Sequence, residues 1–135
     1  MTQKLISNKY KKASVETANR GHLLLMLYEA AILHIKKAIQ AIESKDLARK
    51  GDHITRAHDI LNELQNTLDF KIGGQLAIDL DRLYLFVTEQ LVEANLSNST
   101  PPLQTSITIL ENLLSGWRVA VGEVNRRNHS TQKTE

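Results

Sequence analysis

Residues 100–124 read TPPLQTSITILENLLSGWRVAVGEV, and their apolar side chains recur every three or four positions. This spacing places them on one face of an α-helix. The face consists of Leu103, Ile107, Leu110, Leu114, Trp117, Val121 and Val124. Thr100 and Pro101 form an N-cap and a favoured first-turn proline, so the helix is predicted to begin there. An apolar face of this length needs other elements to pack against it.

Three more helices are predicted before this one, by the same periodicity. They run from about Asn19 to Ser44, from about Asp46 to Asp69 and from Gln75 to Leu96. Gly73 and Gly74 precede the third of them, and adjacent glycines allow a tight chain reversal. Long helices joined by short loops run antiparallel to their neighbours. The sequence therefore predicts an all-α fold, an antiparallel four-helix bundle.

The composition agrees with one helical domain. The chain has 135 residues, of which 41% are hydrophobic, 24% are charged and 4% are aromatic. This apolar content is enough for a single core, and the aromatic fraction is too low for an all-β protein. Apolar residues are scattered at the start of the chain and absent from its end. We therefore predict a flexible N-terminal arm at 1–18, the bundle at 19–124 and a disordered polar tail at 125–135.

Several classes of protein are excluded by what the sequence lacks. The chain has no cysteine, which excludes a disulfide framework, a thiol nucleophile and cysteine-ligated metals. Its formal net charge of +2 is not gathered into a dense basic stripe, so no nucleic-acid partner is expected. The longest apolar stretch, Leu23 to Ile35, is shorter than the roughly 20 residues of a membrane span. Without a signal-peptide pattern either, the expected location is the cytoplasm, without membrane insertion.

No catalytic, cofactor-binding or metal site is predicted. Di-metal sites in helical bundles need Glu-x-x-His pairs, and no glutamate here has a histidine three positions later. His53 and His58 are five positions apart, so on a helix they point in different directions. The chain has no glycine-rich phosphate loop and no Gly-x-Ser-x-Gly turn. The sequence predicts that the protein is not an enzyme.

One enzyme-like alternative remains open at this stage. His34 with Lys37, and His53 with Arg56, resemble the His-x-x-Lys-Gly phosphoacceptor site of histidine phosphotransfer domains, which are also four-helix bundles. A phosphoacceptor histidine must be exposed, whereas His34 lies within an apolar helix face. Ala57 stands where the phosphotransfer pattern has glycine.

An ordered series of short motifs resembles the FliS family of flagellar secretion chaperones over residues 10–120. The motifs are Tyr10, Val15, Thr17-Ala18, Leu23, Leu27-Tyr28, Ala38, Ile42, Ala57, Ile60, Glu63-Leu64, Leu68-Asp69, Gly73-Gly74, Ala77, Leu80, Leu83-Tyr84, Ala94-Asn95 and Trp117. The chain departs from the family pattern at two places. Asn19-Arg20 replaces a frequent Ser-Pro, and Leu83-Tyr84-Leu85-Phe86 replaces Leu-Tyr-Asp-Tyr.

The resemblance implies a cytoplasmic export chaperone without catalytic activity. Its partner would be the C-terminal, unpolymerised segment of flagellin. The chaperone would prevent premature polymerisation and deliver flagellin to the flagellar type III secretion apparatus. A component of that apparatus, or an adaptor, would be a second partner.

The resemblance also implies an N-terminal cap over part of the client-binding surface. We assign the cap to Tyr10, with Leu5 and Ile6 as helpers. For the flagellin-binding groove we select apolar residues of the second and third helices: Ile54, Ala57, Ile60, Leu61, Leu64, Leu83 and Tyr84. For any one of these residues, a place in the plain core of the bundle is favoured over contact with the client. Trp117, Leu110 and Leu114 are assigned to the core.

The first and third predicted helices carry more apolar surface than one packing stripe requires. Excess apolar surface indicates a partner. A flagellin segment is the first hypothesis, and a homodimer that pairs two copies through the same surface is the second. The carrier hypothesis fails if every such leucine and isoleucine is internal and every outward flank is polar.

Overall fold

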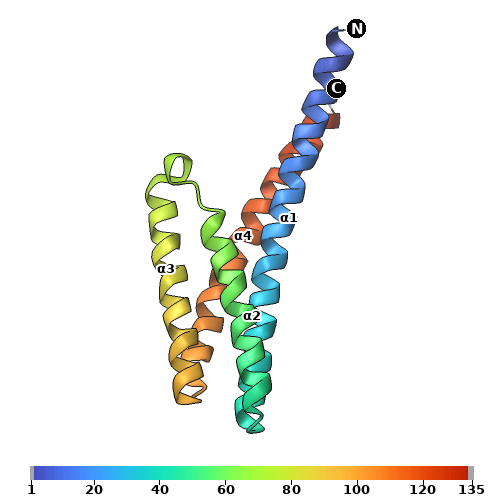
Figure 1. Ribbon diagram of the computed structural model, residues 1–135. Helices are drawn as coiled ribbons and strands as arrows, with labels where there is room; N and C mark the ends of the chain where they lie inside the picture. Colours follow the sequence, from blue (N-terminus) through green and yellow to red (C-terminus); the bar gives the residue numbers. More distant parts are fainter. Residues whose placement is uncertain (1, 134–135) are drawn as a thin grey trace.

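The computed structural model describes the backbone of residues 2–133 and the side chains of residues 19–128. The chain forms four helices, α1 (Thr2–Glu43), α2 (Leu47–Asn66), α3 (Phe70–Ser97) and α4 (Pro101–Lys133), shown in Figure 1. No strand occurs within residues 2–133. The predicted all-α antiparallel four-helix bundle is confirmed.

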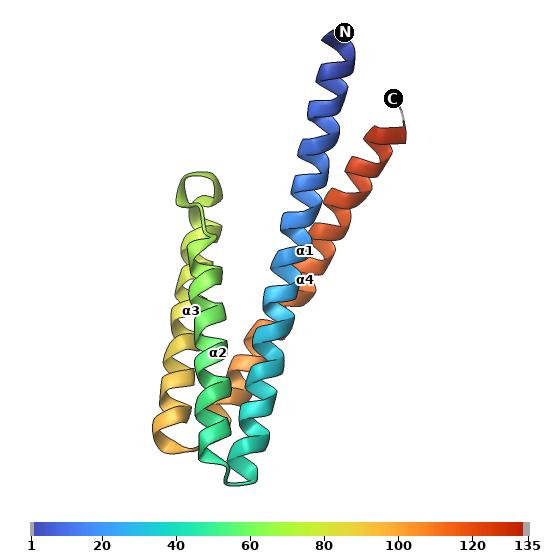
Figure 2. The same ribbon diagram turned by 45° about the vertical axis from the view of Figure 1, so that its right-hand side comes forward.

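The two helix pairs separate toward one end of the bundle. Figures 1 and 2 show α2 and α3 side by side, while α1 and α4 lean away from them near the connection between α2 and α3. In both views α1 and α4 also run on past the end of α2. The bundle is therefore open at this end.

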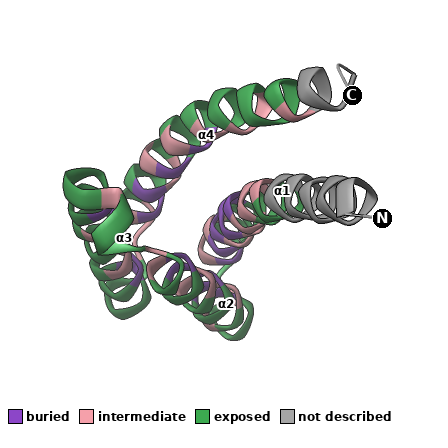
Figure 3. Ribbon diagram, turned by 90° about the horizontal axis from the view of Figure 1, so that it is seen from above, coloured by how far each residue is buried: buried purple, intermediate pink, exposed green. Residues whose placement is uncertain are grey.

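Each helix packs against its neighbours in the chain, and α4 closes the ring by packing against α1. Viewed from above, the four helices surround a common centre, with the buried residues on their inner faces (Figure 3). Helices α1 and α3 lie diagonally, as do α2 and α4, because neither pair makes close backbone contacts. The loops at 44–46, 67–69 and 98–100 are too short for any arrangement but antiparallel neighbours.

Helix α1 begins much earlier than the apolar pattern predicts, at Thr2 instead of about Asn19. Residues 2–18 contain neither glycine nor proline. Their helix propensity therefore extends the helix through a segment where the apolar stripe is weak. The same reason applies to α4, which continues through the polar residues 125–133. The division of the chain into an arm, a bundle and a tail stays a prediction.

Asp46 and Asp69 determine where α2 and α3 begin. A carboxylate oxygen of Asp46 accepts a hydrogen bond from the backbone N–H of Arg49 at 3.2 Å. Asp69, predicted as the end of the second helix, caps the third, since its carboxylate accepts from the N–H groups of Lys71 and Ile72 at 3.0 and 3.1 Å. Aspartate is favoured at such positions because it satisfies N–H groups that lack a partner within the helix.

Gly74 lies inside α3, with φ 51° and ψ −127°, and kinks the helix after its first turn. Any residue with a side chain larger than the hydrogen atom of glycine is strained at these φ and ψ values. The reversal between α2 and α3 therefore extends from residue 67 to Gly74, and the straight part of α3 begins at the predicted Gln75.

A buried lysine joins the start of α2 to the end of α3. The Nζ group of Lys50 donates to the carbonyl oxygen of Asn95 at 2.9 Å and to the side-chain oxygen of Asn98. Asn98 has the left-handed conformation, φ 53° and ψ 36°, typical of a residue that ends a helix. The lysine thus satisfies acceptors at the C-terminal end of α3 and holds that end to α2.

The core is built from aliphatic side chains and two tyrosines, contributed by all four helices. Its buried members are Tyr28, Ala31, Ile32, Ile35, Ala38, Ile54, Ala57, Leu61, Leu64, Leu80, Tyr84, Val87, Leu91, Ala94, Leu103, Leu110 and Leu114. Leu110 and Leu114 are core residues as predicted, and the partly buried Trp117 packs against the cluster.

Candidate functional site: an apolar cleft at the open end of the bundle

A cleft of about 670 Å³ lies where the two helix pairs separate. Helices α1 and α4 form one wall, and the other consists of the α2–α3 connection and the first turns of α3. The apolar lining residues are Leu23, Leu24, Leu27, Leu68, Ile72, Leu76, Ala77, Leu80, Trp117, Ala120, Val121 and Val124. Arg20, Thr67, Asp69 and Asn125 supply polar groups to its lining. The cleft is therefore a mainly apolar hollow with a few polar groups.

Gly21 allows the wall of α1 and α4 to form. A Cβ atom at this position would lie 2.9 Å from Cγ1 and 3.2 Å from Cγ2 of Val121. The absence of a side chain at Gly21 thus lets α4 approach α1 closely at the cleft.

The deep part of the cleft contains an aromatic hydrogen-bond network. Tyr84 and Trp117 line the cleft, and both are linked to Tyr28. The hydroxyl groups of Tyr28 and Tyr84 are hydrogen-bonded to each other, and Trp117 Nε1 donates to the Tyr28 oxygen at 3.0 Å. Burial raises the pKa of both tyrosines, so their hydroxyl groups stay neutral at ordinary pH. The network is therefore electrically neutral where it lines the cleft.

Large apolar side chains of the cleft are open to water. Ile72 is 87% exposed, Leu76 is 59% exposed and Leu23 is 57% exposed. A concave apolar surface with a few polar groups fits the apolar face of an amphipathic helix. The outer side of α3 is also apolar in part, with Leu85, Phe86, Val92 and Leu96 exposed. The outward flanks are therefore not all polar, and the condition under which the carrier hypothesis fails is not met.

Most of the groove residues selected from the sequence lie in the core instead. Ile54, Ala57, Leu61, Leu64 and Tyr84 are at most 4% exposed. Ile60 is half-buried, and Leu83 is 36% exposed. Tyr84 is the one member of the set that lines the cleft. Client contact through the buried members stays a prediction, and it would require the helices to separate.

The cap residues Leu5, Ile6 and Tyr10 lie outside the side chains that the structure describes. The cleft residues Leu68, Ile72 and Leu76 are not among the groove residues predicted from the sequence. No periodic signal separates them, because Leu68 and Ile72 lie in the chain reversal and Leu76 continues the stripe of the buried Leu80.

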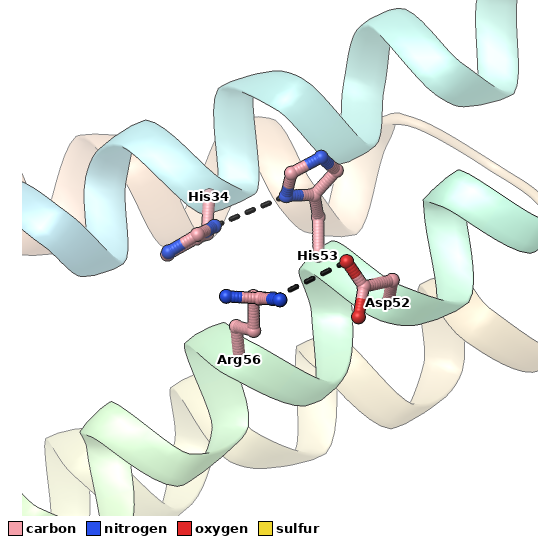
Figure 4. A network of polar contacts seen from close by, with 4 residues as sticks. All are labelled: His34, Asp52, His53 and Arg56. Atoms are coloured by element: carbon pink, nitrogen blue, oxygen red, sulfur yellow. Dashed lines mark hydrogen bonds and ion pairs between the residues drawn. The ribbon is translucent and has the colours of Figure 1, made fainter.

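The histidines of the phosphotransfer-like pattern lie on another surface, along the contact between α1 and α2. His34 Nδ1 and His53 Nδ1 are 3.0 Å apart, and the two rings are tilted by 30° (Figure 4). Arg56 forms an ion pair with Asp52 beside them, with 3.2 Å between Nε and Oδ2. Within the described part of the chain, no group of three or more His, Cys, Asp or Glu side chains could hold a metal ion.

None of the helices, over the described residues, has the length and apolar character that crossing a membrane requires.

Comparison with protein families gives a match between residues 2–124 and the family described as "Flagellar protein FliS". The chain belongs to the FliS family. The match covers α1, α2 and α3, α4 as far as Val124, and every residue that lines the cleft except Asn125. The resemblance seen in the sequence is thereby confirmed.

Curated FliS relatives align with most of this chain. The flagellar secretion chaperone FliS of Bacillus subtilis is 32% identical over 122 residues, which are 90% of this chain and 90% of the relative. FliSB of Pseudomonas aeruginosa is 37% identical over 106 residues, 78% of this chain and 84% of the relative. FliS of Salmonella typhimurium is 30% identical over 114 residues, 81% of this chain and 84% of the relative. A chaperone of flagellar secretion is the function that these names share.

Proposed function

We propose that this FliS protein is a cytoplasmic export chaperone that binds the C-terminal segment of flagellin. In this proposal, binding prevents premature polymerisation, and the complex is delivered to the flagellar type III secretion apparatus. The chaperone acts by binding and release, without catalysis. The observation that carries the proposal is the apolar cleft at the open end of the bundle, in a chain that belongs to the FliS family.

The exposed apolar residues of the cleft account for the binding energy. Burying a leucine or isoleucine side chain that was open to water contributes about 1.5–3 kcal/mol. Ile72, Leu76 and Leu23 are all exposed before a client arrives. Ordering a flexible segment opposes binding by roughly 2–5 kcal/mol, so several such side chains are needed together. A row of apolar side chains along an amphipathic client helix would meet them in one cleft.

The same contact explains how polymerisation would be prevented. An unassembled amphipathic segment exposes an apolar stripe that would otherwise pair with other copies. Covering that stripe in the cleft removes the surface through which copies associate. The predicted cap of Tyr10, Leu5 and Ile6 belongs to this proposal as a segment that moves when the client binds.

The test is calorimetric titration of the whole chain with the C-terminal segment of flagellin. We expect saturable binding near one to one with a negative heat-capacity change, the mark of buried apolar surface. Leu76→Glu places a carboxylate in the apolar cleft and should weaken binding at least tenfold, about 1.4 kcal/mol. Circular dichroism of the variant checks that it remains folded.

Leu96→Glu is the matched control, because Leu96 also lies on α3, is 78% exposed and does not line the cleft. This variant should bind as the unchanged chain does. Two results would contradict the proposal: absence of binding by the folded chain, or equal weakening by both glutamate variants.

A further inference from the structure

The contact between α1 and α2 contains a pair of imidazoles that the proposed function does not use. His34 of α1 and His53 of α2 approach through their Nδ1 atoms at 3.0 Å, with ring centroids 5.3 Å apart. Figure 4 shows both rings between the two helices, with a nitrogen atom of each directed toward the other. A hydrogen bond between two Nδ1 atoms requires one to donate and the other to accept. The acceptor ring must therefore be unprotonated at Nδ1.

The charges around the pair oppose a second proton. Lys37 on α1 and Arg56 on α2 both act on His34 as positive charges, and Asp52 is the acidic group that opposes them. The Asp52 carboxylate is already paired with Arg56. Burial, followed by the charges of His53, Arg56 and Lys37, lowers the pKa of His34 below its ordinary value. A divalent metal ion between the rings would meet the same repulsion from Lys37 and Arg56.

Helix α4 contacts α1 on another face, where the charges are balanced. Lys36 pairs with Glu111 at 3.3 Å, and Glu29 pairs with Arg118 at 3.3 Å. Among the side chains of residues 19–128, the contact between α1 and α4 contains these two ion pairs and no pair of imidazoles. Protonation of the two histidines at low pH would therefore change the contact between α1 and α2.

The position of the pair connects this contact to the cleft. Helices α1 and α2 are joined by the loop at 44–46, and the other end of their contact reaches Leu24, Leu27 and Leu68 in the cleft wall. His34 and His53 lie between the loop and the cleft. Loosening the helices at this point would shift the α1 wall of the cleft relative to the α2–α3 connection.

We propose that His34 and His53 form a proton-sensitive latch between α1 and α2. With one shared hydrogen bond the latch is closed. When both rings are protonated, each becomes a donor without an acceptor and the two positive charges repel, so the helices part along this contact. As regulation of client binding the latch rests on the proposed function, whereas the change in the helix contact does not.

The experiment is hydrogen exchange of the free chain, measured by mass spectrometry at pH 7.5 and pH 5.5 and corrected for the intrinsic pH dependence of exchange. We expect exchange in residues 28–60 to accelerate on the order of tenfold at the lower pH, which is the effect of losing one hydrogen bond between the helices. The contact between α3 and α4 serves as the internal reference and should change little. No client is present, so the result is independent of flagellin binding.

Three variants separate the latch from a general effect of acid. His34→Gln and His53→Gln keep an amide that can hydrogen-bond across the gap but cannot take up a proton, and both should lose the acceleration. His58→Gln is the control, because His58 meets Asn62 within α2, at 3.4 Å. This variant should respond as the unchanged chain does. Equal acceleration in all three variants, or none in the unchanged chain, would overturn the proposal.

A second measurement keeps the proposal testable if the histidine variants loosen the helix contact at both pH values. Nuclear magnetic resonance should show His34 taking up its proton below the ordinary pKa of 6.5. In His53→Gln the midpoint should rise toward 6.5, since one of the charges that lowers it has been removed. A His34 midpoint that does not respond to His53→Gln would refute the latch.

Discussion

The hydroxyl group of Tyr28 on α1 is hydrogen-bonded to the hydroxyl group of Tyr84 on α3, across the diagonal of the bundle. The ring centroids are 6.3 Å apart and the ring planes are inclined by 55°. Both tyrosines are at most 1% exposed. Helices α1 and α3 make no close backbone contacts, so this bond links two helices that lie diagonally across the core. Trp117 adds α4 to the same network.

Removing either hydroxyl should destabilise the fold, and Tyr28→Phe should cost more than Tyr84→Phe. Tyr84→Phe removes one buried hydrogen bond, which costs about 1 kcal/mol. Tyr28→Phe leaves both the Tyr84 hydroxyl and the Trp117 N–H without this partner, which costs about 1–3 kcal/mol for the buried hydroxyl and less for the partly buried N–H. Urea unfolding followed by circular dichroism measures the difference. Equal losses in the two variants would show that the Trp117 bond contributes nothing.

Alkaline pH should unfold the protein through the same tyrosines. Burial raises the pKa of Tyr28 above 10.0, and burial together with the bond to Tyr28 raises that of Tyr84. The folded state therefore holds its phenolic protons more tightly than the unfolded chain. The stabilisation is present below pH 10 and is lost as the pH rises through the folded-state values.

The measurement for this prediction is phenolate absorbance recorded together with helical circular dichroism. The ionisation of Tyr28 and Tyr84 should coincide with loss of helix. In the double variant Tyr28→Phe, Tyr84→Phe, the remaining loss of helix should depend less on pH above 10. Phenolate formation by both tyrosines in a chain that stays fully helical would contradict the prediction.

The fold could be predicted from the sequence because apolar periodicity determines which residues face the core. This periodicity predicts the first residues of α2 and α4 to within a few positions. It misplaces the start of α1, where residues 2–18 are helical without a regular apolar stripe. It also assigns Asp69 to the end of a helix, whereas this side chain caps the next one. Capping depends on which N–H groups lie within reach of the carboxylate. The spacing of apolar residues does not show that geometry.

The candidate site was harder to predict, because a core face and a binding face have the same pattern. Ile54, Leu61 and Leu64 form a regular stripe on α2, and this stripe is internal. The cleft residues Ile72 and Leu76 lie on either side of the Gly74 kink, and Leu76 has the spacing of the same stripe as the buried Leu80. Their exposure follows from the angle at which α1 and α4 leave the other pair, and side-chain spacing carries no information about that angle.

Gly21→Ala should weaken the wall of the cleft, whereas Gly122→Ala should stabilise the fold. An added Cβ at Gly21 would contact Val121 at 2.9 Å, so overpacking of about 1–3 kcal/mol outweighs the gain in helix propensity. Nothing lies within 4 Å of a Cβ added at Gly122, and alanine there should add about 0.4–1 kcal/mol. Thermal unfolding compares them. Val121→Ala added to Gly21→Ala should recover part of the loss, and a stabilised Gly21→Ala would disprove the close packing.

Gly74→Ala should lower stability by about 1–3 kcal/mol, because alanine is strained at a φ of 51° with ψ −127°. The strain would be relieved by moving the first turn of α3, which carries Ile72 in the cleft wall. Gly51→Ala is the control in another helix, since nothing lies within 4 Å of its added Cβ and its φ is not positive. That variant should gain about 0.4–1 kcal/mol in urea unfolding. If both alanines stabilise the chain equally, the kink at Gly74 does not depend on glycine.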